Sequence, residues 1–276
     1  MILFAADLDN TLIASYRKLP ADYPLCETLD GRRLSYLTPA AYRALLRLPA
    51  GVLLVPVTTR SSEQYRRVRL PGGEPEWALC CNGGVLLHRG AEEEGWRQES
   101  EKLISGTVPA LRRGMELLGR DPAVLGEARM VENLFVFAKS ERPEKTLLRL
   151  REAMAGEPVV VDGTGQKVYL IPAPLSKGAG LARLRKRLRP KRIVAAGDSL
   201  LDLSMLRLAD VAAFPAGSPL AAALAGHPGA RPYGGEAAGF GAFAVQCALG
   251  DARRAQPAQQ NGLEAGRILA QGPRRL

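Results

Sequence analysis

The 276-residue chain is poor in the residue types that build many metal and nucleophilic sites. It holds only two histidines, His88 and His227, and four cysteines without Cys-X-X-Cys spacing. The chain therefore has too few histidines and suitably spaced cysteines for a zinc site, a histidine-based catalytic triad or a disulfide framework. We expect both histidines to lie at the surface or in loops, and we expect a cytoplasmic protein, because the cytoplasm keeps thiols reduced.

Long apolar runs and aromatic side chains are also scarce. No run approaches the roughly 18 apolar residues that span a bilayer, and the first apolar run ends at Asp7, unlike a signal peptide. Aromatic residues make up 5% of the chain and do not alternate with the arginines behind its net charge of +10. Stacking surfaces for nucleic acid bases are thus missing. The arginine-rich segments 65–69 and 181–192 are expected to form solvated helix faces or to attract small anions, with nucleic acid binding kept as an alternative class.

The apolar segments that are present alternate with helical patterns. This order predicts an α/β fold with a parallel sheet. The predicted buried strands cover residues 2–6, 51–57, 77–81, 192–196 and 211–214. Helices are expected at residues 38–48, after Ser61 or Ser62, at 177–188 and at 201–208. An Asp30-Gly31 turn predicts a small hairpin early in the chain.

The pattern changes between residues 85 and 171. Strands at 85–88 and 130–138, helices at 108–118 and 143–154 and a hairpin at 159–171 are expected there. These residues predict a separate α+β unit inserted into the parallel-sheet domain. The predicted organisation is therefore 1–84 and 172–250 for the two parts of the core, 85–171 for the insert and 251–276 for a C-terminal tail, frayed or forming a lone helix.

Polar side chains stand at the ends of predicted strands or at the head of a helix: Asp7, Asp9, Thr58, Lys177, Asp198 and Asp202. In open α/β sheets ligands bind at the carboxyl ends of the strands. A carboxylate nucleophile can accept a phosphoryl group there, while a second acid moves a proton. A hydroxyl and an ammonium group can hold the phosphoryl oxygens. Crowded carboxylates then call for a divalent cation, and an oxygen-only ligand set suits Mg²⁺.

These segments resemble the four motifs of the haloacid dehalogenase superfamily. The matching segments are FAADLDNTL at 4–12, LLVPVTTR at 53–60, LSKGAGLARL at 175–184 and GDSLLDLSML at 197–206. The resemblance implies that Asp7 is the nucleophile and a metal ligand. Asp9 would be the general acid/base, with its backbone carbonyl on the metal. It further implies the remaining roles: phosphate binding for Thr58 and Lys177, metal ligation for Asp198, and ligation through water or support for Asp202.

The chain departs from the family pattern at two places. Thr59 stands where members with this type of insert often have glycine, and Leu201 stands where asparagine often precedes the last aspartate. The position of the insert, between Thr58 and Lys177, resembles the α+β-capped members: Cof-type sugar phosphatases, sucrose-phosphate and mannosylphosphoglycerate phosphatases, and phosphomannomutases. The implied fold is a Rossmann-like core with an inserted α+β cap.

The resemblance also suggests where substrates bind. The candidates are Arg60, Asn82 and Gly83 on the core and Glu132, Asn133, Lys139 and Arg142 on the cap. The function expected is a Mg²⁺-dependent phosphatase that cleaves a small phosphorylated sugar or polyol through an aspartyl phosphate. An acid at Asp9 favours phosphatases and mutases over P-type ATPases. A phosphosugar mutase with the same site is the alternative enzyme, and a non-catalytic nucleic-acid-associated protein is the alternative from another class.

Overall fold

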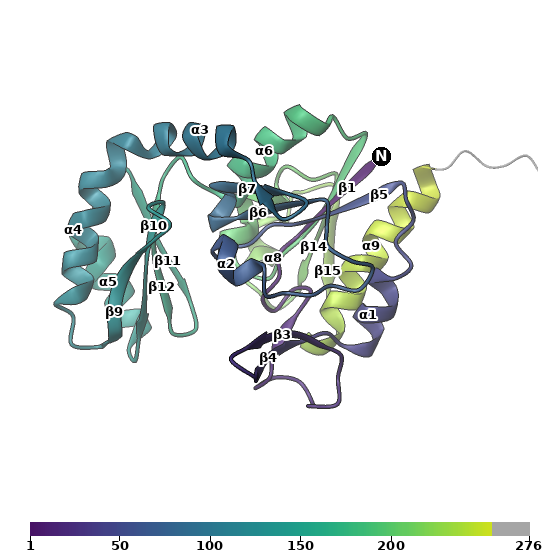
Figure 1. The fold of residues 1–276 in the computed structure, drawn as a ribbon, viewed down its shortest axis with the longest axis horizontal. Coiled ribbons are helices and arrows are strands. Elements are labelled where there is room, and N and C mark those ends of the chain that lie inside the picture. Colours follow the sequence, from purple (N-terminus) through teal and green to yellow (C-terminus); the bar gives the residue numbers. More distant parts are fainter. Residues whose placement is uncertain (256–276) are drawn as a thin grey trace, which may run out of the picture.

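The computed structural model describes residues 1–255. Its centre is a five-stranded sheet in the order β15-β14-β13-β1-β5, with all strands parallel (Figure 1). The strands are β1 (Ile2–Ala6), β5 (Val52–Pro56), β13 (Arg192–Ala196), β14 (Val211–Pro215) and β15 (Ala230–Tyr233). The order reverses around β1, so β1 lies near the switch point where such sheets form their ligand sites.

Both faces of this sheet are covered, and β1 shows how. Phe4 points into one apolar layer, and Leu3 points into the other. The first layer contains residues of α1 (Pro39–Leu45) and α9 (Phe240–Ala255), and the second contains residues of α6 (Lys177–Leu188), α7 (Leu203–Leu206) and α8 (Leu220–Ala223). A strand buried on both faces is apolar at every position, which explains the continuous run that begins the chain.

A second, antiparallel sheet has the order β11-β12-β10-β9. Its strands are β9 (Val124–Val131), β10 (Phe135–Ser140), β11 (Val159–Thr164) and β12 (Lys167–Pro172). The helices α4 (Val108–Gly119) and α5 (Pro143–Ala153) pack on one face of it and form a separate apolar cluster. Figure 1 shows these helices on the side away from the parallel sheet. The other face of the antiparallel sheet is therefore free to line a cavity.

Smaller elements complete the core and its link to the antiparallel unit. One short sheet contains β2 (Ala14–Ser15), β3 (Leu25–Leu29) and β4 (Arg32–Tyr36), and another contains β6 (Trp77–Cys80), β7 (Val85–His88) and β8 (Ala91–Glu92). Two further helices are α2 (Ser62–Tyr65) and α3 (Glu94–Ile104), and α3 leads from β8 towards α4 (Figure 1). Within residues 1–255, no helix combines the length and the apolar character needed to cross a membrane.

The α/β fold class with a second α+β unit is confirmed, but several local predictions were wrong. The single strand predicted at 130–138 is two strands, β9 and β10, because Glu132 and Asn133 turn the chain at φ 47° and 58°. Asparagine is tolerated in this left-handed region, so the Glu-Asn pair was the overlooked turn signal. The expected boundary at residue 85 falls inside the hydrogen-bonded hairpin of β6 and β7.

The elements that were missed include α3, β15 and α9. Helix α3 is mostly charged, and only Trp96, Ser100 and Ile104, four residues apart, are buried. Strand β15 contains a proline, which edge strands tolerate. Helix α9 was missed because glycine and alanine weaken its pattern. The tail expected at 251–276 begins inside α9, where Asp251 pairs with Arg192, and residues 256–276 lie outside the described residues.

Candidate functional site

The carboxyl end of β1 carries the first acidic group of the site. The backbone of β1 stays paired with β13 up to its last residue, and the amide of Asp7 then donates to the carbonyl of Ala196 at 2.9 Å. This bond places Asp7 beside the loop that holds Asp198 and Asp202. Ligand oxygens of these three aspartates lie within 4.8 Å of one another.

Lys177 lies between two of these carboxylates. It is the first residue of α6, whose N-terminus is capped by the Ser176 hydroxyl accepting from the amide of Ala179 at 3.0 Å. The ammonium group donates to Asp7 Oδ1 and to Asp202 Oδ1, each at 2.5 Å, and its side chain is only 2% exposed. Although burial opposes it, the two carboxylates raise the pKa of Lys177, so the group stays charged.

Asp202 has no free oxygen in this arrangement. Its Oδ1 accepts from Lys177, and its Oδ2 accepts from the amides of Asp198 and Ser199 and from the Ser199 hydroxyl at 3.0–3.1 Å. The side chain is fully buried. Asp202 therefore holds the loop and the ammonium group in place.

Asp7 and Asp198 are buried close to other carboxylates, which opposes their ionisation. Burial and the neighbouring carboxylates raise the pKa of Asp7 well above its ordinary value, against the lowering effect of Lys177. Burial and Asp202 raise the pKa of Asp198 to about 6. A divalent cation would relieve this repulsion, and carboxylate oxygens are the ligands that Mg²⁺ takes. The residues present therefore fit a Mg²⁺ ion, with Asp7 and Asp198 as its carboxylate ligands.

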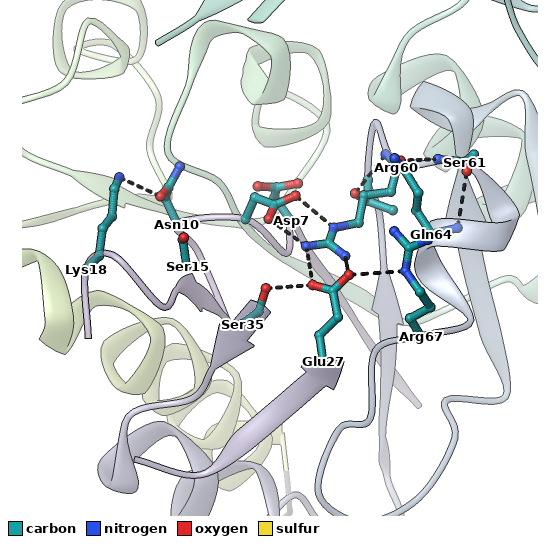
Figure 2. A network of polar contacts seen from close by, with 12 residues as sticks. Asp7, Asn10, Ser15, Lys18, Glu27, Ser35, Arg60, Ser61, Gln64 and Arg67 are labelled. Carbon is teal, nitrogen blue, oxygen red and sulfur yellow. Dashed lines mark hydrogen bonds and ion pairs between the residues drawn. The ribbon is translucent and has the colours of Figure 1, made fainter. Parts of the chain in front are cut away.

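Asp9 belongs to a second polar network. The Arg60 guanidinium donates from Nε to Asp9 Oδ2 at 2.9 Å and from Nη2 to Asp9 Oδ1 at 2.8 Å. Burial alone would raise the pKa of Asp9, but these bonds outweigh it and lower the pKa to about 2. Figure 2 shows Arg60 reaching Glu27, where the hydroxyl of Ser35 donates at 2.6 Å and Arg67 approaches to 3.5 Å.

The second motif brings Thr58 to the end of β5. The residue is fully buried, and its hydroxyl oxygen accepts from the amide of Arg60 at 3.1 Å. Its neighbour Thr59 is partly exposed and lines the cavity described below, which Thr58 does not. The structure thus brings both hydroxyls to the edge of the sheet, in different surroundings.

Asn82 and Gly83 contact the chain that leads into α6. The Asn82 side-chain amide donates to the carbonyl of Leu175 at 3.2 Å, and its Oδ1 is buried without a hydrogen-bond partner in the described residues. A Cβ added at Gly83 would lie 2.8 Å from the carbonyl oxygen of Ser176. These contacts fix the start of α6, so both residues support the position of Lys177 and neither lines the cavity.

A cavity of about 220 Å³ lies between the parallel-sheet core and the antiparallel sheet. The core contributes Asp9, Thr59, Arg60 and Gln64. The antiparallel sheet contributes Arg129, Val131, Phe135, Phe137, Lys139, Lys167 and Tyr169. Of the four candidates on the predicted cap, only Lys139 lines this cavity.

Glu132 has a different position. Its Oε1 accepts from the amide and the hydroxyl of Ser62 at 2.6 and 2.8 Å, and its Oε2 accepts from Arg97 at 2.6 Å. The β9–β10 turn is thereby tied to α2 of the core. Asn133, in the same turn, and Arg142, the residue before α5, also lie outside the cavity lining.

Sequence reasoning missed several residues of the site. Glu27 belongs to a hairpin strand far from every motif, and only the fold brings it to Arg60. The sequence pattern places Lys167 and Tyr169 in a hairpin strand. Their alternation with the aliphatic residues at 168 and 170 places both side chains on one face of the strand, but it does not tell which part of the core lies opposite that face.

Comparison with solved structures identifies the fold. The sucrose-phosphatase of Synechocystis sp., solved with sucrose and phosphate, matches 91% of this chain and 98% of its own at 19% identity and a TM-score of 0.61. A protein of Thermoplasma acidophilum matches 90% of this chain and 98% of its own at 14% identity and a TM-score of 0.62. No family model and no curated protein sequence matches the chain.

The chain therefore has the fold of the haloacid dehalogenase superfamily. A putative HAD/Cof-like hydrolase of Plasmodium vivax matches 90% of this chain and 95% of its own at 13% identity and a TM-score of 0.58. A match of that extent includes the antiparallel sheet as well as the parallel one. The fold shared with this hydrolase therefore extends over both sheets.

Proposed function

We propose that this protein is a Mg²⁺-dependent phosphatase that acts in the cytoplasm on a small phosphorylated metabolite. One observation carries the proposal: Asp7, Lys177 and Asp198, which belong to three separate motifs, meet at the carboxyl edge of the parallel sheet. Similar folds include a sucrose-phosphatase solved with sucrose and phosphate, which supports a sugar or polyol phosphate as the substrate class.

Asp7 is the nucleophile in this proposal. Its carboxylate attacks phosphorus, the bond between phosphorus and the ester oxygen breaks, and an aspartyl phosphate forms. Water then attacks the phosphorus and releases inorganic phosphate, which restores the carboxylate. Lys177 is anchored by Asp202, so its ammonium group orients Asp7 and neutralises charge on the phosphoryl oxygens. Thr58 supplies a hydroxyl for the same oxygens.

A bound Mg²⁺ would offset the negative charge that Asp7, Asp198 and the phosphate bring together. Asp7 and Asp198 would hold it through carboxylate oxygens, and Asp9 through its backbone carbonyl. Asp202 would act through water or by supporting the loop, since both its oxygens already accept hydrogen bonds.

Asp9 moves the proton. In the Arg60 fork Asp9 is ionised and both of its oxygens accept hydrogen bonds, so it can take a proton from the attacking water only when the fork loosens. To donate a proton to the leaving alcohol it must first take one up, which requires the fork with Arg60 to loosen. Arg60 and the cavity beside it would contact the leaving group.

Hydrolysis of p-nitrophenyl phosphate tests the proposal. The purified protein should release p-nitrophenol with Mg²⁺ and stop when EDTA is added. Asp7→Asn should abolish turnover, and activity retained in this variant would overturn the assignment of the nucleophile. Recovery of a phosphosugar with its phosphate moved to another position, without free phosphate, would replace the phosphatase by a mutase.

A further inference from the structure

One wall of the cavity is built from a single face of the antiparallel sheet. In the strand register, Phe137 of β10 stands between Arg129 of β9 and Tyr169 of β12. The alternate residues of the same strands, such as Val136 and Leu170, face α4 and α5. The side chains that line the cavity therefore share the face turned towards the parallel-sheet core.

This face carries three cations. They are Arg129, Lys139 and Lys167, and within residues 1–255 none of them forms an ion pair with a carboxylate. Arg129 lies over the ring of Phe137 at 5.3 Å. The one acidic residue of the lining, Asp9, is already bound to Arg60. Asp162 is the cross-strand partner of Tyr169 and therefore lies on the same face. Its Oδ1 accepts a hydrogen bond from the amide of Gly163, and the residue does not line the cavity.

Lys139 and Lys167 are direct cross-strand partners. Like charges in this position repel and destabilise a sheet, because their Cβ atoms are only about 5 Å apart. Burial opposes the charge of Lys167, but Tyr169 and Asp9 raise its pKa, so it remains a cation. Two adjacent ammonium groups that face a cavity form a binding site for an anion, which would offset their repulsion.

The floor beneath these cations is apolar. Phe135 and Tyr169 are almost fully buried, and their rings lie 6.2 Å apart, with Phe137 at 5.4 Å from Tyr169. Phe137 keeps part of its ring exposed, so a carbon skeleton can pack on it while its charged end reaches the cations. The volume of the cavity is about 220 Å³. It suits a small leaving group.

We propose that the alcohol released by this enzyme carries an anionic group of its own, a carboxylate or a second phosphate, which Arg129, Lys139 and Lys167 bind. This inference rests on the proposed phosphatase function. In the proposed function, Lys177 and the carboxyl edge of the parallel sheet bind the phosphoryl group that is transferred. The three cations on the antiparallel sheet are therefore available to bind a second anion.

Matched pairs of substrates test it. One pair is 3-phosphoglycerate and glycerol 3-phosphate, which differ by a carboxylate. The other is fructose 1,6-bisphosphate and fructose 6-phosphate, which differ by a phosphate. We expect kcat/KM to be about tenfold or more higher for the anionic member of at least one pair, as for other charge-assisted hydrogen bonds. The pair that shows the preference identifies the anion.

Variants connect the preference to the site. Lys139→Gln and Arg129→Gln should each lower the ratio of kcat/KM between the two members about tenfold. Both residues are exposed, so the fold tolerates their replacement. Lys145→Gln is the matched control, since Lys145 is an exposed lysine of α5 outside the cavity, and it should leave the ratio and the activity unchanged.

Calorimetric binding in EDTA separates the two proposals, because it needs no turnover. If the protein cleaves p-nitrophenyl phosphate but treats both members of each pair alike, the anion site is wrong and the phosphatase stands. If p-nitrophenyl phosphate is not cleaved, the phosphatase fails. Tighter binding of the anionic members, weakened by Lys139→Gln, would then still support the site, whereas equal binding would overturn it.

Discussion

The guanidinium of Arg60 binds Asp9 on one side and Glu27 on the other. It donates to both oxygens of Asp9, at 2.9 and 2.8 Å, and lies 2.9 Å from Glu27 Oε1 through its third nitrogen. Glu27 is only 3% exposed, so its carboxylate is buried and depends on this partner. A hairpin that carries none of the sequence motifs is thereby joined to the proposed catalytic acid.

Removal of Arg60 should therefore destabilise the fold. Arg60→Gln leaves the buried carboxylate of Glu27 without its main counter-charge, and we expect the free energy of unfolding to fall by about 3 kcal/mol. The double variant Arg60→Gln/Glu27→Gln removes both charges and should recover most of that loss. Urea unfolding measures both values. Equal stability of the single and double variants would show that Glu27 does not depend on Arg60.

Mg²⁺ should stabilise the folded protein through the aspartate cluster. A ligand that binds only the native state raises its stability in proportion to the logarithm of the ligand concentration. We expect the melting temperature of the wild type to rise with MgCl₂ and that of Asp198→Asn to rise much less. Asp22→Asn is the control, because Asp22 is exposed and outside the cluster. An equal shift in all three proteins would place the ion elsewhere.

Local sequence patterns predicted most of the strands and helices of the fold. The apolar runs that end at Asp7, Thr58 and Asp198 are strands because both faces of a parallel sheet are buried, and burial on both faces leaves a continuous signal. Helix α3 has no such signal. Most of its charged residues face solvent, and its buried side chains are Trp96, Ser100 and Ile104.

The residues of the candidate site also divide into those whose position could be predicted from the sequence and those whose position could not. Asp7, Lys177 and Asp198 lie at strand or helix ends, and the parallel topology brings those ends together, so their meeting could be predicted. Glu27 and Lys167 could not, because their places in the site depend on how a hairpin and a second sheet pack against the core. Contacts of this kind are absent from the local pattern.

Gly83 should be needed for the position of Lys177. Gly83→Ala places a methyl group 2.8 Å from the Ser176 carbonyl oxygen and 3.0 Å from Gly180 Cα, so the start of α6 must shift. Gly72→Ala is a matched control, since Gly72 has φ +89° against +91° at Gly83 but nothing within 4 Å. Gly72→Ala should lower the free energy of unfolding by about 1 kcal/mol, because only backbone strain opposes it. Gly83→Ala should lower it by about 2 kcal/mol more, because the added methyl group also overpacks the start of α6.

The rate of turnover should also differ between Gly83→Ala and Gly72→Ala. A displaced α6 moves the ammonium group of Lys177, so turnover of p-nitrophenyl phosphate should fall about tenfold or more in Gly83→Ala. Gly72→Ala should keep wild-type turnover. Identical losses of stability and activity in the two variants would mean that the close approach of Gly83 to α6 has no influence on the site.

Glu132 should make stability depend on pH. Although burial opposes it, the hydrogen bonds from Ser62 and Arg97 lower the pKa of Glu132 below its ordinary value. A depressed carboxylate pKa stabilises the fold above the ordinary value of about 4.3 and loses this effect as the pH falls through the folded-state value. Glu132→Gln should thus lower the free energy of unfolding by about 2 kcal/mol at neutral pH and by less in acid.

Urea unfolding of Glu132→Gln at neutral and acidic pH checks this sign. Glu101→Gln is the control, because Glu101 is an exposed residue of α3 without an ion pair in the described residues, and its stability should follow the wild type. A difference between Glu132→Gln and the wild type that grows as the pH falls would contradict the assignment of the stabilising charge to Glu132.

The four thiols should react slowly in the native protein. Burial raises the pKa of Cys26 from 9.0 to about 12 and that of Cys247 from 9.0 to about 11, and it also raises the pKa values of Cys80 and Cys81. Because the thiolate is the reactive form, a rise of two units lowers its population about 100-fold. Cys247 is half-buried and the other three are buried, so Ellman's reagent should modify Cys247 first and all four only in denaturant. Cys247→Ser should remove the fastest phase, and a fast phase that persists in this variant would show that one of the buried thiols is accessible.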